Sequence, residues 1–317
     1  MGKLTRILFA TDLHGSDLCF RKLINAVKIY KADVLIIGGD ITGKAIVPVI
    51  EEKGIYTASF FDSTHTAKNK DELEKLIKYI KDVGFYPYQL TKEEFENIKD
   101  DHEKQMEIFK HLMMERLKEW IKTLEDHFAK TNVKVFIMPG NDDYYFIDEI
   151  LNSSDYVVNS DKKVVQIDDY HEMITIGESN ITPWKCPRDV TEEELSKIIE
   201  QLVSQVSNID KSIFNIHVPP YGTKIDLCPK LDEQLRIVHK AGQIIMDHAG
   251  SKAVYDAIKK YQPLLGLHGH IHEAKGFDKI GKTLILNPGS EYAEGILHVA
   301  IINVDKDKVK GHMILTG

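Results

Sequence analysis

Five short clusters of Asp, Asn, His and Gly, each following an apolar run of strand length, constrain the fold of this chain of 317 residues. The apolar runs cover 4–10, 33–37, 133–138, 212–216 and 263–267. The clusters that follow them are Asp12-Leu13-His14, Gly38-Gly39-Asp40, Gly140-Asn141-Asp142-Asp143, His217 and His268-Gly269-His270-Ile271-His272. Because α/β sheets build their sites from the loops at the carboxyl ends of strands, the pattern predicts a sheet whose loops converge on one site.

The first 40 residues predict a strand, a helix and a second strand. The helix is expected at about 16–31, where apolar residues recur near helical spacing. Strand, helix and strand of these lengths are typical of a right-handed βαβ unit with parallel strands. We therefore expect the strands at 4–10 and 33–37 to be parallel.

The pattern changes between about 68 and 130, where the chain is highly charged, helical in character and without a strand signal. One apolar stripe steps through this segment by three or four residues: Met106, Phe109, Met113, Leu117, Trp120, Leu124 and Phe128. We interpret the segment as two or three helices that form a cap-like insertion at about 55–130 between elements of the core. A solvated helical hairpin without functional contacts is the alternative.

Strand-like runs return after the insertion and alternate with helical segments. Further candidate strands cover 163–167, 173–176, 283–286, 296–304 and 308–315, and helices are expected at about 191–206 and 252–260. We find no internal repeat and no low-complexity linker in the sequence. The pattern predicts a layered α/β sandwich, and we expect 1–317 to form a single domain with one insertion.

Composition and charge argue against several classes of protein. The apolar stretches are strand-sized, well below the 18 or more residues of a membrane helix, and no signal-peptide pattern is evident. The 41 basic and 49 acidic residues give a net charge of −8, which disfavours broad nucleic-acid binding and leaves room only for a local basic patch. Three distant cysteines, Cys19, Cys186 and Cys228, form neither a disulfide framework nor a CxxC zinc pair. We therefore expect a cytoplasmic protein without a membrane partner.

The five clusters together supply oxygen and imidazole donors without thiolate, a set that suits Mn, Fe, Zn, Ni or Co. Taken one at a time they are weak signals, because Gly-Gly-Asp and Pro-Gly-Asn-Asp are turn sequences and a lone histidine such as His217 is more often a core or helix-end residue than a metal ligand. The Gly-His-x-His run is a stronger signal for a metal site, since alternate positions place His270 and His272 on one side of an extended segment. All five clusters in this order are hard to explain as turns. A centre with two metal ions also needs a carboxylate that bridges them, because two dications repel at ~3.5–4 Å.

The order Asp-x-His, Gly-Asp, Gly-Asn, His and Gly-His-x-His resembles the calcineurin-like metallophosphoesterase superfamily. The resemblance extends from Asp12 to the segment 287–290, Asn-Pro-Gly-Ser, a frequent late loop of that family, and covers nearly the whole chain except the insertion. The segment 217–223, with Asp226 after it, is similar to a branch of predicted phosphoesterases related to the bacterial cyclic-nucleotide phosphodiesterases. In this segment Tyr221 and Asp226 either line a pocket or stabilise a turn.

The resemblance implies a four-layer α-β-β-α sandwich that holds two metal ions, each of them Mn, Fe, Zn or Ni. Position by position, it implies that one ion is bound by Asp12, His14 and His272, that the other is bound by Asn141, His217 and His270, and that Asp40 bridges the two. The implied reaction is hydrolysis of phosphate mono- or diesters by in-line attack of a hydroxide shared by both ions. A small phosphoester is then the expected substrate, and no oligomeric state is indicated.

One position departs from the family pattern. Many members carry His directly after the Gly-Asn pair, near the scissile ester, whereas this chain has Asp142 there. A carboxylate repels a phosphate unless it is protonated or turned away, so we expect activated or diester substrates to be hydrolysed better than unactivated alkyl monoesters. The residues expected to act in catalysis are Asp40, Asn141 and Asp142. A metal-binding scaffold of the same fold and a nuclease of the same superfamily are the alternative functions.

Overall fold

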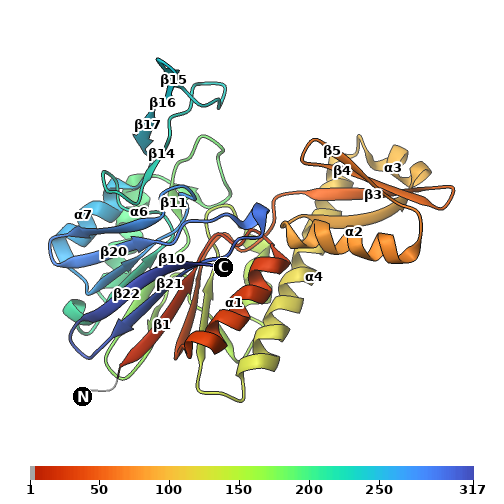
Figure 1. The fold of residues 1–317 in the computed structure, drawn as a ribbon. Helices are drawn as coiled ribbons and strands as arrows, with labels where there is room; N and C mark the ends of the chain where they lie inside the picture. The colour runs from red at the N-terminus through yellow and green to blue at the C-terminus, as the bar shows by residue number, and fades with distance from the viewer. Residues whose placement is uncertain (1–3) are drawn as a thin grey trace.

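Two six-stranded sheets lie face to face in the structure, a computed structural model that describes residues 4–317. In the first sheet the strand order is β22 (Val309–Thr316), β21 (His298–Val304), β1 (Thr5–Ala10), β2 (Val34–Gly38), β7 (Lys134–Met138) and β8 (Val157–Asn159). In the second sheet the order is β19 (Gly276–Ile280), β20 (Thr283–Asn287), β18 (Leu265–Leu267), β13 (Ile213–Ile216), β10 (Glu172–Ile176) and β9 (Val164–Gln166). Both sheets lie in the left half of the molecule in Figure 1.

Strand β1 shows why the apolar runs in the sequence are continuous. Ile7 and Phe9 lie in the core between the two sheets, whereas Leu8 and Ala10 lie in the core between the first sheet and its helices. All four side chains are fully buried. A strand that is covered on both faces needs apolar residues at successive positions, which is the pattern that predicted a buried strand at 4–10.

Helices cover the outer face of each sheet and complete a four-layer α-β-β-α sandwich. The first sheet is covered by α1 (Asp17–Tyr30), α4 (His102–Phe128) and α5 (Asp148–Leu151), and the second by α6 (Glu192–Val203) and α7 (Lys252–Tyr261). α1 begins after Ser16, whose side chain accepts a hydrogen bond from the Cys19 amide. The predicted sandwich and its predicted helices are thus confirmed. Among residues 4–317, none of the helices combines the length and the apolar character that a membrane crossing requires.

The strand ends that carry the polar clusters lie at one edge of each sheet. β1, β2 and β7 run parallel, with Ile7 opposite Val34 and Val34 opposite Lys134. In the second sheet β13 and β18 run parallel, with Ile213 opposite Leu265. Because parallel strands end at the same edge of a sheet, the loops that follow them lie side by side. The β1–α1–β2 unit is the predicted βαβ unit.

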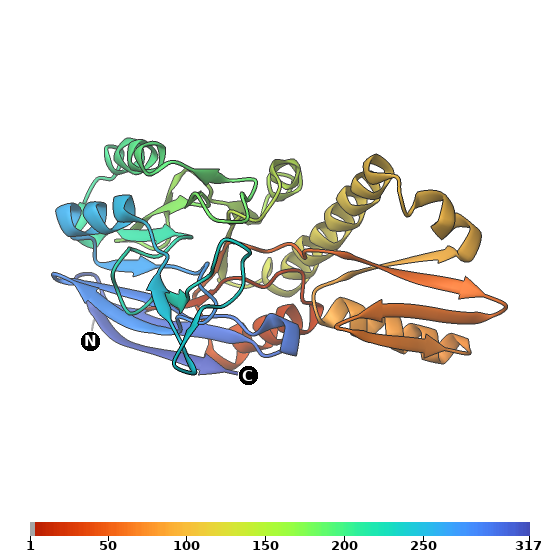
Figure 2. The same ribbon diagram turned by 90° about the horizontal axis from the view of Figure 1, so that it is seen from above.

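The segment between β2 and α4 forms a projecting lobe that contains a sheet as well as helices (Figures 1 and 2). Its strand order is β5 (Ser63–Ala67), β4 (Ile55–Phe60), β3 (Ile46–Glu52) and β6 (Tyr86–Thr91). Helix α2 (Lys70–Asp82) packs on this sheet, and the short helix α3 (Lys92–Ile98) follows β6. Apolar side chains of α2 and the strands form a separate small core.

The lobe differs from the helical insertion that the sequence predicted at about 55–130. Its strands are short, partly exposed and contain Ser, Thr and Glu residues, and Pro48 and Pro87 lie within β3 and β6, so the apolar strand signal is weak. Helix α4 belongs to the sandwich, because Leu117 and Trp120 pack in the core of the first sheet. The Trp120 ring stacks on Phe20 of α1 with 4.2 Å between ring centroids. The part of the apolar stripe from Leu117 to Phe128 therefore faces the sandwich, whereas Met106 is exposed and the Phe109 ring contacts Tyr86 of the lobe.

A narrow arm projects between β13 and α7, at the top of Figure 1. At its base β14 (Leu227–Pro229) pairs with β17 (Met246–His248), and farther out β15 (His239–Lys240) pairs with β16 (Gln243–Ile244). Elsewhere, the short strands β11 (Ser179–Asn180) and β12 (Asp189–Val190) enclose the loop 181–188. The arm and this loop both line the cavity described below.

Candidate metal centre

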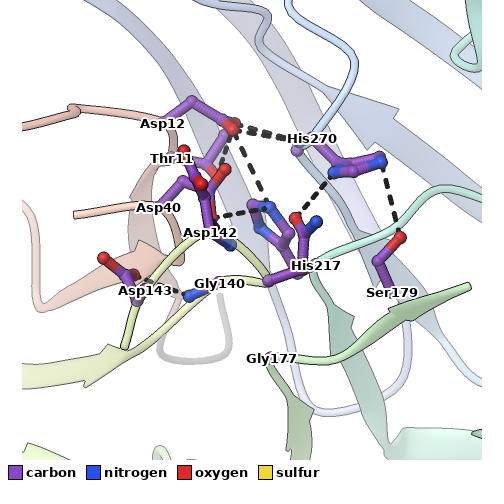
Figure 3. A network of polar contacts seen from close by, with 12 residues as sticks. Thr11, Asp12, Asp40, Gly140, Asp142, Asp143, Gly177, Ser179, His217 and His270 are labelled. Atoms are coloured by element: carbon purple, nitrogen blue, oxygen red, sulfur yellow. Dashed lines mark hydrogen bonds and ion pairs between the residues drawn. The ribbon is translucent and has the colours of Figure 1, made fainter. Parts of the chain in front are cut away.

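The loops after five strands bring all seven expected ligands into one cluster, part of which is drawn in Figure 3. Asp12 and His14 follow β1, Asp40 follows β2, Asn141 follows β7, His217 follows β13, and His270 and His272 follow β18. In two groups of three, Asp12, His14, His272 and Asp40, His217, His270, one donor atom from each residue lies within 4.8 Å of the others. The structure therefore brings these residues together as the motifs predicted, and their roles as ligands stay a prediction.

The first group joins the loops after β1 and β18. The Nε2 atoms of His14 and His272 are 3.1 Å apart, and Asp12 Oδ1 lies 3.4 Å from His272 Nε2. His14 and Asp12 are buried, and the side chain of His272 is partly exposed. Two imidazole nitrogens and a carboxylate oxygen that converge in this way form a donor set for a transition metal.

The second group joins the loops after β2, β7, β13 and β18. Asp40 Oδ1 lies 3.4 Å from His217 Nε2, and Asn141 Oδ1 lies 2.9 Å from His270 Nδ1. Asn141 thus adds a neutral oxygen donor to two imidazoles and one carboxylate. This set also suits a transition metal.

Asp40 lies between the two groups. Its Oδ1 faces His217 of the second group, and its Oδ2 lies 3.6 Å from His14 Nε2 of the first. Each carboxylate oxygen is therefore directed at a different set of donors. This is the arrangement that a ligand shared by two metal ions needs.

The backbone at four of these residues has a conformation that residues other than glycine rarely adopt. The φ angles are +54° at Asp12, +40° at His14, +47° at Asp40 and +66° at His270. Each such residue costs of order 1–3 kcal/mol, and the surrounding structure must hold it in place. Two neighbouring glycines allow the close packing: a Cβ atom at Gly140 would overlap the Asp40 carboxylate, and one at Gly269 would overlap that of Asp12.

His217 keeps one ring nitrogen directed at the cluster. Its Nδ1 lies 2.9 Å from the carbonyl oxygen of Gly38, which only accepts hydrogen bonds, so Nδ1 carries a proton. Its Nε2 is buried without a hydrogen-bond partner in the described part of the chain and points toward Asp40 (Figure 3). Burial alone lowers the pKa of His217, but the charges of Asp40 and Asp12 raise the pKa to about 10. A metal ion bound to Nε2 would replace the second proton of the ring.

Several of the other donors are already in the protonation state that metal ligands require. Burial raises the pKa of Asp12, but the hydrogen bond from His272 and the charge of His217 lower it to about 2. Burial lowers the pKa of His14 to about 3 and that of His270 to about 4. Ionised carboxylates and neutral imidazoles bind a metal without first losing a proton.

Two residues that sequence analysis missed orient candidate ligands through hydrogen bonds without belonging to the predicted ligand set. Thr11 Oγ1 donates a hydrogen bond of 2.7 Å to Asp12 Oδ2. Asn141 Nδ2 donates a hydrogen bond of 2.9 Å to Asp189 Oδ1, which leaves the amide oxygen of Asn141 facing His270. Contacts of this kind fix the direction of a metal ligand. Thr11 directly precedes the first cluster, whereas no sequence signal connects Asp189 to Asn141.

Asp143 has a structural role that its motif does not reveal. Its carboxylate accepts hydrogen bonds from the backbone amides of Ile41, Thr42 and Gly140, at 3.0, 2.9 and 2.8 Å. It is fully buried. Asp143 thereby ties the loop after β2 to the loop after β7 and fixes the spacing of the candidate ligands that they carry.

Asp142, the residue that departs from the family pattern, forms an ion pair. Its Oδ2 lies 3.1 Å from Lys44 Nζ and 4.0 Å from His14 Nδ1. Burial and the charge of Asp40 raise the pKa of Asp142. Burial lowers the pKa of Lys44, but the carboxylates of Asp142 and Asp40 raise it above its usual value. Sequence analysis missed Lys44, because no motif includes it.

A cavity of about 750 Å³ opens beside the cluster. Asp40, Asn141 and His270 line it, together with Lys44 and Asp142. The candidate ligands and the ion pair thus face one space that is large enough for a small-molecule substrate.

Comparison with known proteins relates the chain to one curated relative by sequence. No family model matches the chain. The uncharacterized protein MJ1162 of Methanocaldococcus jannaschii is 35% identical over 159 residues, which make up 49% of this chain and 64% of that protein. The chain therefore spans less than two thirds of the length of this relative.

Two solved structures share the fold over nearly the whole chain. One is 17% identical and superposes with a TM-score of 0.60, covering 99% of both chains. The protein TT1561 of Thermus thermophilus is 13% identical and superposes with a TM-score of 0.54, again covering 99% of both chains. At these identities the likeness concerns the fold alone, and it agrees with the layered α/β sandwich described above.

Proposed function

We propose that this chain, which has the fold of the calcineurin-like metallophosphoesterases, hydrolyses phosphate esters with the help of two bound metal ions. The observation that carries the proposal is the position of Asp40, whose two carboxylate oxygens face two separate groups of donors. A structural site for one ion needs no shared carboxylate. Two ions held on either side of one carboxylate are suited to in-line displacement at phosphorus.

The donor chemistry determines which residues would hold each ion. One ion would be held by Asp12, His14 and His272, the other by Asn141, His217 and His270, with Asp40 shared. Mn, Fe, Zn and Ni all accept this mixture of oxygen and imidazole donors. When bound, the ions supply Lewis acidity, which polarises a phosphoryl oxygen and lowers the pKa of water. The neutral amide of Asn141 limits the negative charge that an anionic phosphate must approach.

We assign Lys44 as the residue that donates hydrogen bonds to the phosphoryl oxygens of the substrate. It lines the same cavity as the ligands, and its Nζ is held 3.1 Å from Asp142. An ammonium group donates charge-assisted hydrogen bonds to phosphoryl oxygens, whereas an ionised carboxylate repels them. Lys44 would therefore contact the substrate, and Asp142 would position Lys44. This proposal changes the expected role of Asp142 from catalysis to positioning.

Replacing Lys44 with Gln is expected to lower kcat/KM by about 10- to 100-fold, because a charged donor to the transition state is lost. Lys44→Arg is expected to restore part of the activity, since the cation remains. Steady-state kinetics on metal-loaded protein measures both effects. The matched control is Lys282→Gln, which removes an exposed lysine paired with Asp210 and should leave kcat/KM unchanged. Equal activity of Lys44→Gln and wild type would contradict the assignment.

The proposed function is tested by a panel of aryl phosphodiesters, aryl monoesters and alkyl monoesters, assayed with Mn²⁺, Fe²⁺, Zn²⁺, Ni²⁺ or no added ion. We expect ion-dependent hydrolysis that is faster for aryl diesters than for alkyl monoesters, because Asp142 replaces the histidine that could protonate a poor leaving group. Elemental analysis of the same preparation measures bound metal. An alkyl monoester hydrolysed as fast as an aryl diester would contradict the preference.

The same panel separates the proposed function from its alternatives. Metal-loaded protein that hydrolyses none of the esters would favour a metal-binding scaffold. Single-stranded DNA is included as a substrate, and with a net charge of −8 we expect no degradation of it. Degradation that depends on metal and falls with salt would favour a nuclease.

A further inference from the structure

The outer part of the cavity beside the metal centre has an apolar wall that the chemistry of the centre does not require. The loop 181–188 contributes Ile181 and Trp184, which are 61% and 62% exposed. The arm contributes Leu231 and Ile237, the latter 46% exposed. Large apolar side chains scattered singly over a surface need no explanation, but a gathering of them marks a binding site.

The loop that carries Trp184 is fixed to the metal centre through Asp189. Asp189 Oδ2 accepts hydrogen bonds from the backbone amides of Thr182 at 2.9 Å and Cys186 at 3.0 Å. Its Oδ1 accepts the hydrogen bond of 2.9 Å from Asn141. One carboxylate therefore holds both the apolar wall and a proposed metal ligand. The fold thus sets the distance between them, as a site for a single molecule requires.

The part of the cavity wall that the arm contributes is fixed at the base of the arm. Asp226 is fully buried and accepts hydrogen bonds of 2.9 Å from the amides of Gly222 and Thr223, so this residue stabilises a turn. It also lies 2.7 Å from His248 Nδ1, which donates to it. His248 lines the cavity, and Nε2 is the ring nitrogen that does not take part in the hydrogen bond to Asp226. The arm therefore contributes one oriented imidazole beside its apolar side chains.

We infer that the outer part of this cavity binds a large apolar group, aromatic or alkyl, that is esterified to the phosphorus of the substrate. The inference rests on the proposed function and names the substrate class of the same site. Its basis is continuity, because a single cavity is lined by Asp40 and His270 and also by Trp184 and Ile237. A phosphoester held at the metal centre would therefore place its organic group against the apolar wall. The volume of about 750 Å³ accommodates groups far larger than methyl.

The test uses two series of p-nitrophenyl phosphodiesters and the metal-loaded full chain. The second ester group grows from methyl to octyl in the alkyl series, and from methyl through phenyl to naphthyl in the aryl series. We expect kcat/KM to rise with the size of this group, by about two- to fourfold per methylene over the first additions. The alkyl series represents a flexible hydrocarbon chain and the aryl series a flat ring, so the series with the steeper rise identifies which group the wall accepts.

Variants of the wall make the test specific. Trp184→Ala and Ile237→Ser are expected to lower the octyl-to-methyl and naphthyl-to-methyl ratios of kcat/KM by about tenfold. Each ratio compares two substrates on one preparation, so a partial loss of folded protein cancels. Leu235→Ser is the matched control, because Leu235 is 44% exposed on the same arm but is not among the residues that line the cavity. Its ratios should equal those of wild type.

The outcomes separate this inference from the proposed function. If the methyl ester is hydrolysed but neither series rises with size, the apolar subsite is overturned and the proposed function stands. The subsite is also overturned if the ratios persist in both Trp184→Ala and Ile237→Ser. If metal-loaded protein hydrolyses no ester at all, the proposed function fails and this inference fails with it.

Discussion

Replacing Asp40 with Asn is expected to lower kcat/KM by at least about 10³-fold and to reduce the metal content of the protein. The amide has the shape of the carboxylate and retains an oxygen that can accept the 3.0 Å hydrogen bond from the Asp142 amide, so the loop should keep its fold. What is lost is the negative charge that both groups of donors share. Steady-state kinetics and elemental analysis of the same preparation measure the two effects.

Asp210→Asn is the matched control for this experiment. Asp210 is an exposed aspartate whose partner is Lys282, so the same chemical change there should leave activity and metal content as in wild type. An Asp40→Asn variant with wild-type kcat/KM would contradict the role of Asp40 as a shared ligand. An ester-hydrolysing activity that is insensitive to this residue would have to arise elsewhere in the preparation.

Withdrawal of the metal by a chelator is expected to abolish hydrolysis and to lower Tm by about 5–10 °C. Ions that bind only the folded chain stabilise it by mass action, and their removal leaves the buried carboxylates of Asp12 and Asp40 without a cation. Burial lowers the pKa of His217, but Asp40 raises it to about 10, so the metal-free ring is protonated at neutral pH. Rebinding must expel this proton, and metal affinity should therefore rise as the pH is raised toward 10.

Thermal unfolding and titration calorimetry at a series of pH values measure these effects. Addition of the removed ion should restore both activity and Tm, which excludes damage by the chelator itself. The Asp40→Asn variant, with its weakened centre, should show a smaller change in Tm than wild type. An unchanged Tm on chelation, in protein that contained stoichiometric metal beforehand, would contradict the proposed stabilisation.

The sandwich and its cluster of candidate ligands could be predicted because their signals are local. Side chains such as Phe9 and Leu8 are buried on opposite faces of β1, so the strand appears in the sequence as a continuous apolar run. The cluster then begins where the run ends, as Asp12 does after β1 and His217 after β13. Parallel pairing carries these ends to the same edge. The order of apolar runs and polar clusters along the chain was therefore sufficient to predict that the clusters lie close together in the fold.

The residues that complete the site could not be predicted, because they act across long stretches of sequence. Lys44 pairs with Asp142 and Asp189 contacts Asn141, and neither contact has a local pattern. The sheet of the lobe was missed for a related reason: its partly exposed strands are stabilised by pairing and by the small core under α2, and not by apolar runs of their own. Asp142 and Asp143 are adjacent aspartates that the sequence does not distinguish. Asp142 lines the cavity, whereas Asp143 connects the loops after β2 and β7 through hydrogen bonds.

Metal binding at the proposed site would depend on the whole fold, because four candidate ligands have positive φ angles that the surrounding structure must maintain. These residues are Asp12, His14, Asp40 and His270. A peptide copied from any single loop would relax to ordinary backbone angles, and its side chains would turn away from a common point. Local unfolding at the end of one of these strands, in either sheet, would likewise move the candidate donor atoms apart. If the proposed metal ions bind, their retention would depend on the loops of both sheets, and loss of the ions would be an early sign of partial unfolding.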